Sequence, residues 1–111
     1  MTDLDMSVNE ISEECGADSH AWFPDTADNV FFMAACAAGE VGEAINYLKK
    51  IERGTHYPEE VMGEVLSECM DAFIYLMCIF DIEGQDVTAL YRKVREANAR
   101  RFGAPAAAAG S

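Results

Sequence analysis

The chain has 111 residues, with 20 acidic and eight basic side chains and a formal net charge of −12. This charge argues against a nucleic acid as partner, because binding to a polyanion requires a basic surface. The length suits one globular domain. The sequence has neither a basic-then-apolar leader nor an uncharged apolar run of membrane length, so we expect a cytoplasmic protein that does not bind membranes.

The N-terminal part of the chain predicts only a short helix, within Asp3 to Cys15, followed by a loop at His20 to Pro24. We therefore interpret residues 1–24 as an N-terminal segment and residues 25–103 as the main helical domain. Residues 104–111 are mostly alanine and glycine, a composition that predicts a disordered tail.

Start and stop signals along the main domain predict three long helices. The second, for example, begins at Pro58, which favours a first helical turn, and ends at Gly84, which favours a helix terminus. No sustained alternation of polar and apolar residues indicates a strand. The expected fold is all-α, a helical bundle with long helices at about residues 26–53, 58–83 and 86–102.

The second long helix is apolar on nearly every side between Ala72 and Phe80. Such a helix must be covered all round, which three helices in one small chain can hardly achieve. Gly39 and Gly42 lie inside the first long helix, where each costs about 1 kcal/mol relative to alanine, and this favours close approach of a neighbouring helix or a ligand. We therefore expect a homo-oligomer, either a homodimer or a homotetramer.

Two pairs of carboxylates interrupt the apolar parts of these helices, Glu40 with Glu43 and Glu68 with Asp71. Their i,i+3 spacing places both members of a pair on one helix face. Acids are abundant in this chain, so the spacing alone is weak evidence. The apolar surroundings distinguish these four, because buried like charges are costly unless a cation binds them. Carboxylate oxygens suit a hard divalent cation, so we expect Mg²⁺, or Mn²⁺, at this site.

The basic residues lie in two short segments, at the end of the first long helix and along the third. The helix dipole alone favours cations at helix C-termini, but basic segments beside an acidic metal cluster also suit a small polyphosphate such as a nucleotide. Lys50 lies about two turns beyond Glu43 on the same helix face, within reach of a metal-bound phosphate tail. Tyr75 shares the face of Glu68 and Asp71, and we expect it to belong to the core.

Three segments carry these features in one order: AGEVGEAINYLKKIERG (Ala38 to Gly54), SECMDAFIYL (Ser67 to Leu76) and RKVREANARRFG (Arg92 to Gly103). Together they resemble the small single-domain members of the MazG-type all-α nucleoside triphosphate pyrophosphohydrolases. The four carboxylates match the family signature, in which Glu-x-x-Glu and Glu-x-x-Asp are separated by a spacer. The resemblance covers most of the chain, from about Trp22 to Gly103.

This resemblance implies an enzyme that hydrolyses a nucleoside triphosphate or deoxynucleoside triphosphate to the monophosphate and pyrophosphate with Mg²⁺. It implies that Glu40, Glu43, Glu68 and Asp71 bind the metal and form the catalytic site. The metal would bridge phosphate oxygens and offset the charge that develops in the transition state.

The resemblance also implies positions that contact the substrate. Family members use a lysine and an asparagine of the last helix near the phosphates, and Lys93 and Asn98 match them. Their five-residue spacing sets them about 140° apart around the helix, which leaves Arg95 or Arg101 as an alternative source of positive charge. In similar proteins aromatic residues near the start of the first long helix contact the base, which makes Trp22, Phe23 and Phe32 candidates.

Two other functions remain open from the sequence. One is the related phosphoribosyl-ATP pyrophosphohydrolase, and the other is a catalytically silent helical interaction module with a structural metal site. A di-iron protein fits poorly, because its Glu-x-x-His motif requires a glutamate three residues before a histidine, and neither His20 nor His56 has one.

Overall fold

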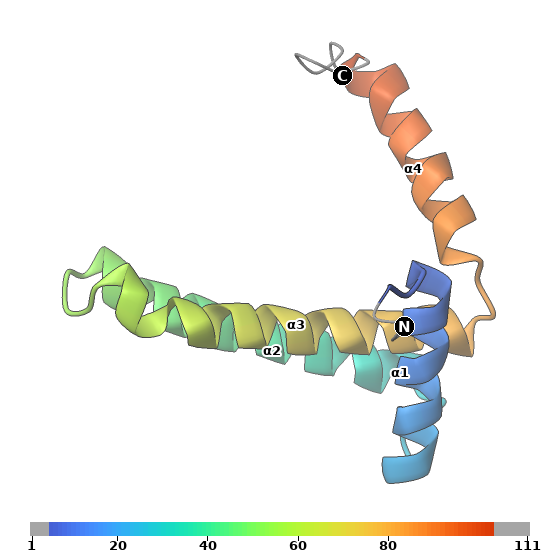
Figure 1. Cartoon of the computed structure of the whole chain (residues 1–111), viewed down its shortest axis with the longest axis horizontal. Helices are drawn as coiled ribbons and strands as arrows, with labels where there is room; N and C mark the ends of the chain where they lie inside the picture. The colour runs from blue at the N-terminus through green and yellow to red at the C-terminus, as the bar shows by residue number, and fades with distance from the viewer. Residues whose placement is uncertain (1–4, 104–111) are drawn as a thin grey trace.

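The computed structural model describes residues 5–103, and 104–111, the segment expected to be a disordered tail, lies outside them. Within these residues the fold contains four helices and no strand, which confirms the expected all-α class (Figure 1). The helices are α1 (Val8–Trp22), α2 (Val30–Glu52), α3 (Pro58–Ile82) and α4 (Val87–Phe102). None of them is long and apolar enough to cross a membrane.

The ends of the last two helices agree with the sequence signals. Pro58 is the first residue of α3, and the Asp86 side chain accepts a hydrogen bond from the Ala89 amide at the start of α4. The hydrogen bond of Asp86 matters because the first amides of a helix have no partner inside the helix. The predicted starts at 58 and 86 are therefore correct to within one residue.

The N-terminal half differs from the prediction in two places. The first long helix begins at Val30 and not near residue 26, because the Asn29 side chain caps it by accepting from the Phe32 amide. The N-terminal helix runs through Trp22 instead of ending by Cys15, so the expected loop from His20 starts too early. Ser7 begins this helix with a capping box, a signal that fixes its start but not its length.

The core of the fold lies between α2 and α3, which run antiparallel as a long pair (Figure 1). The buried residues of α2 are small or flexible, and those of α3 facing them are valine and alanine, so the two helices pack closely. The contributing side chains are Met33, Ala37 and Ala44 from α2, and Val61, Val65 and Ala72 from α3.

Helix α1 crosses the C-terminal half of α3 (Figure 1). The Ser12 hydroxyl donates a buried hydrogen bond of 2.8 Å to the Met77 carbonyl. One turn further along α1, Gly16 lies so close to Asp81 that any side chain there would overlap the carboxyl group. This contact explains why a glycine stands inside α1, where it otherwise lowers helix stability.

Helix α4 leads away from the α2–α3 pair and packs mainly against α1 (Figure 1). Asn9 of α1 holds its start with two hydrogen bonds. The Asn9 side-chain oxygen accepts from the Val87 amide at 2.7 Å, and its nitrogen donates to Asp86 at 3.0 Å. Beyond the first turn of α4, nearly all the side chains of this helix are exposed.

Candidate metal centre

Three of the four predicted carboxylates converge at the middle of the α2–α3 pair. Oxygen atoms of Glu40, Glu68 and Asp71 all lie within 4.8 Å of one another. Glu40 and Glu68 are half-buried, and Asp71 is exposed. Because α2 and α3 are antiparallel, the midpoints of the two helices lie side by side. This arrangement brings Glu40 and Glu68, which are 28 positions apart in the sequence, close together.

The three acids repel one another in the absence of a cation. The pKa of Glu68 lies above its ordinary value, first because of a hydrogen bond with Glu40 and then because of partial desolvation. The negative charges of Glu40, Asp71 and Glu43 raise it further. A cluster of this kind is relieved either by a shared proton or by a bound cation.

Glu43 is the fourth predicted ligand, and it is not one of the three acids whose oxygen atoms converge. It lies one turn beyond Glu40 on α2, is exposed, and is close enough to raise the pKa of Glu68. The structure therefore places Glu43 at the edge of the cluster. Rotation of one side chain about its flexible bonds would be needed for a fourth carboxylate to join the others.

Tyr75 and Cys36 flank the carboxylates and were not among the candidate site residues. Both are half-buried, and their side chains interact across the α2–α3 contact. Desolvation is the main cause of the raised pKa of Tyr75, followed by the charges of Cys36, Glu40 and Asp71. Counting by four from Asp71 places Tyr75 on the carboxylate face, but the sequence does not tell a core tyrosine from one beside a site.

The predicted phosphate-binding residue of α2, Lys50, is some distance from the cluster. Its Nζ lies 5.1 Å from the centre of the Tyr47 ring, a cation–π contact within one helix. It follows Glu43 by two turns, or roughly 10 Å along the axis. A ligand that reached from the carboxylates to Lys50 would have to extend along α2.

The predicted phosphate-binding residues of α4 are not brought to the carboxylates within one chain. Lys93, Asn98 and Arg101 are all exposed on a helix that points away from the α2–α3 pair (Figure 1). Arg101 lies over the neighbouring Phe102 ring, 4.9 Å from its centre. The carboxylates and the α4 cations are thus separate in the single chain.

The candidate base-binding residues are exposed. Trp22 is 68% exposed at the end of α1, and Phe32 is 39% exposed in the first turn of α2. The neighbouring Phe23 and Phe31 are exposed as well. Ordinary core packing therefore does not account for these four aromatic rings within the chain.

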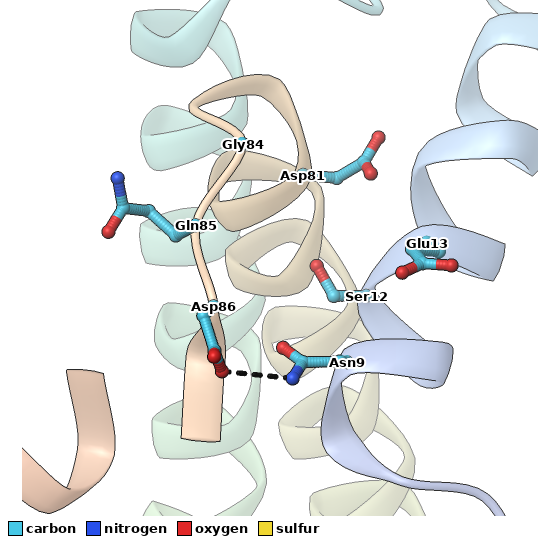
Figure 2. Close-up of a pocket in the computed structure, with 7 residues that line it drawn as sticks. All are labelled: Asn9, Ser12, Glu13, Asp81, Gly84, Gln85 and Asp86. Atoms are coloured by element: carbon cyan, nitrogen blue, oxygen red, sulfur yellow. Dashed lines mark hydrogen bonds between the residues drawn. The ribbon is translucent and has the colours of Figure 1, made fainter. Parts of the chain in front are cut away.

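A polar hollow of about 380 Å³ lies elsewhere, between α1 and the turn from α3 to α4 (Figure 2). Figure 2 shows Asn9 reaching across it to Asp86, with Asp81 and Glu13 on its walls. The polar groups of Asn9 and Asp86 are engaged in holding α4. We therefore assign no ligand to this hollow.

Searches of protein-family models, of curated proteins and of solved structures found no match to this chain. The assignment of the site accordingly depends on the residues and their geometry.

Proposed function

We propose that this protein is a Mg²⁺-dependent nucleoside triphosphate pyrophosphohydrolase of MazG type that works in the cytoplasm as a homodimer or homotetramer. The observation that carries the proposal is the convergence of Glu40, Glu68 and Asp71 within 4.8 Å at the middle of the α2–α3 pair. Three carboxylates so close together form a ligand set that suits Mg²⁺ or Mn²⁺. Glu43, at the edge of the cluster, can add a fourth oxygen ligand.

In the proposed reaction a water oxygen attacks the α-phosphorus of the nucleotide. The bond between that phosphorus and the oxygen bridging to the β-phosphate breaks, and pyrophosphate leaves with the bridging oxygen. One proton of the attacking water passes to a carboxylate of the cluster. Bound Mg²⁺ would supply charge neutralisation at the phosphate oxygens. The carboxylates would hold the ion between two helices, and the buried contacts between these helices keep the helices rigid.

The first test is pyrophosphate release from a panel of standard and modified nucleoside triphosphates, with Mg²⁺ and with a chelator. Chromatography of the products distinguishes the monophosphate from other products. We expect conversion of at least one triphosphate to monophosphate and pyrophosphate with Mg²⁺, and none with chelator. Phosphoribosyl-ATP belongs in the panel, because its exclusive turnover would identify the related enzyme instead.

Variants then test the site. We expect Glu43→Gln and Asp71→Asn each to abolish turnover with unchanged helical content by circular dichroism. Glu83→Gln neutralises an exposed acid at the end of α3, away from the cluster, and should leave turnover unchanged. Full activity of Asp71→Asn at ordinary Mg²⁺ would contradict the metal assignment.

The second candidate function is a catalytically silent module with a structural metal site. The separation of the α4 cations from the carboxylates in the single chain favours it, because Lys93 and Arg101 then do not face a phosphate bound at the carboxylates. Mg²⁺ at 100 times its dissociation constant would raise the free energy of unfolding by about 2.7 kcal/mol. Such stabilisation, lost in Asp71→Asn, together with no turnover of any triphosphate, would establish this function in place of the enzyme.

A further inference from the structure

We propose that protonated His20 is a pH-sensitive clamp that fastens the end of α1 to the loop leading into α2, and that the clamp opens when His20 loses its proton. The inference is argued from the contacts of His20 and does not depend on the proposed function.

Both ring nitrogens of His20 lie against groups that only accept hydrogen bonds. Nδ1 is 2.8 Å from the Gly16 carbonyl oxygen, one turn earlier in α1, and Nε2 is 2.8 Å from Oδ1 of Asp28 in the loop. A neutral imidazole has one N–H and one lone pair, so it can satisfy only one of these two contacts. The imidazolium ion donates to both. The geometry therefore fits the charged ring.

The loop is joined to the two helices through two consecutive side chains. Asp28 accepts from His20 of α1, and Asn29 accepts from the Phe32 amide in the first turn of α2. Helix α1 packs mainly on α3, so the loop and its contacts determine how the end of α1 lies relative to the start of α2 (Figure 1). The neighbouring Ala27 is buried, which gives the loop a fixed place against the fold at the point where the clamp holds it.

The groups around His20 favour its protonated state. The hydrogen bond with the Gly16 carbonyl is the main cause of the raised pKa of His20, and the hydrogen bond with Asp28 is the next. Desolvation acts in the opposite direction, and the negative charges of Asp28 and of Asp81 on α3 raise the pKa further. Desolvation also raises the pKa of Cys78 on α3 above the ordinary value of 9.0, so this thiol stays neutral in the range where His20 titrates.

A rise in pH opens the clamp. A histidine whose pKa in the folded chain lies above the ordinary value of about 6.5 stabilises the fold fully below that value. The contribution is lost as pH rises through the folded value. His20 and Asp28 are both exposed, and exposed ion pairs change a local equilibrium by only about two- to fivefold. Deprotonation should therefore loosen the loop while the α2–α3 pair stays intact.

NMR of the ¹⁵N-labelled histidine rings tests the protonation state. The chain has one other histidine, His56, so His20→Gln identifies the signals of His20. We expect both ring nitrogens of His20 to carry protons at pH 6, its pKa to exceed about 6.5, and Asp28→Asn to lower that pKa. A His20 pKa at or below this value in the wild type would overturn the proposal.

Asp28→Asn separates the clamp from its pH dependence. The side-chain amide accepts from a protonated ring through its oxygen and donates to a neutral ring through its nitrogen, so this variant keeps the contact in either state of His20. Asp28→Ala removes the contact at every pH. Asp25→Asn is the control, because it removes the same charge from the same loop at a residue that is not hydrogen-bonded to the His20 ring.

Hydrogen exchange of the Asn29 amide reports the state of the loop. This amide donates to the Thr26 carbonyl at 3.0 Å, and its exchange is compared with that of an unstructured peptide at the same pH. Between pH 5.5 and 8.5 we expect its protection to fall about two- to fivefold in the wild type and in Asp25→Asn. Protection should stay constant in Asp28→Asn and be low throughout in Asp28→Ala, with unchanged helical content by circular dichroism.

Two results of the exchange experiment would overturn the clamp. One is constant protection of the Asn29 amide in the wild type across this pH range. The other is the same fall in Asp28→Asn as in the wild type, because the opening of the loop would then not follow the protonation of His20.

Discussion

Asn9 is the residue that ties α4 to the rest of the chain, and its replacement by alanine should loosen that helix selectively. The Asn9 side-chain oxygen accepts from the part-buried Val87 amide at 2.7 Å, and its nitrogen donates to Asp86 at 3.0 Å. Loss of a hydrogen bond to a part-buried amide costs about 1–2 kcal/mol. This corresponds to roughly 5- to 30-fold more frequent opening at the root of α4.

Amide hydrogen exchange measures this opening directly. We expect faster exchange at Val87 and along the first turns of α4 in Asn9→Ala, with little change between α2 and α3, because both hydrogen bonds of the Asn9 side chain go to Asp86 and Val87. Glu13→Ala is the control, since Glu13 lines the same hollow but forms no hydrogen bond with α4 (Figure 2). Equal exchange at Val87 in wild type and Asn9→Ala would refute this account of how α4 is held.

The titration of Asp86 gives an independent readout of the same change. The hydrogen bond from Asn9 is the main cause of the lowered pKa of Asp86, and the Ala89 amide is the next. A lowered carboxyl pKa stabilises the fold above the unfolded value, and this stabilisation is lost as pH falls through the folded value. Asn9→Ala should therefore raise the pKa of Asp86, as followed by NMR, and make stability less sensitive to acid.

Three further predictions concern packing and titration. Gly16→Ala should lower stability by about 1–3 kcal/mol in a urea titration, because the added methyl overlaps the Asp81 carboxyl, and Asp81→Ala should restore part of the loss. Gly42→Ala should raise stability by about 1 kcal/mol in the same titration, since nothing lies within 4 Å of an added methyl, and a decrease would mean that a second copy packs there. Burial raises the pKa of Cys15 to about 11 from 9.0, so the unfolded chain loses this proton first and stability should fall between pH 9 and 11, but less so in Cys15→Ala.

Much of the fold could be predicted because its signals are local. Pro58 and Asp86 begin helices through contacts within one turn, so the sequence alone located them. The convergence of Glu40 with Glu68 and Asp71 could also be predicted, because i,i+3 spacing puts each pair on one helix face and two adjacent antiparallel helices can bring these faces together. The length of α1 could not be predicted from the sequence, since its last turns depend on contacts with α3.

The sequence by itself determined the all-α class, the starts of α3 and α4, the location of the acids within apolar stretches and the confinement of five basic residues to the last helix. Only the tertiary structure decided that Glu43 stays at the edge of the cluster and that Lys93, Asn98 and Arg101 point away from it in the single chain. The reason is that the direction of α4 depends on two hydrogen bonds from Asn9, 77 and 78 residues distant, and no local pattern encodes a contact at such separation.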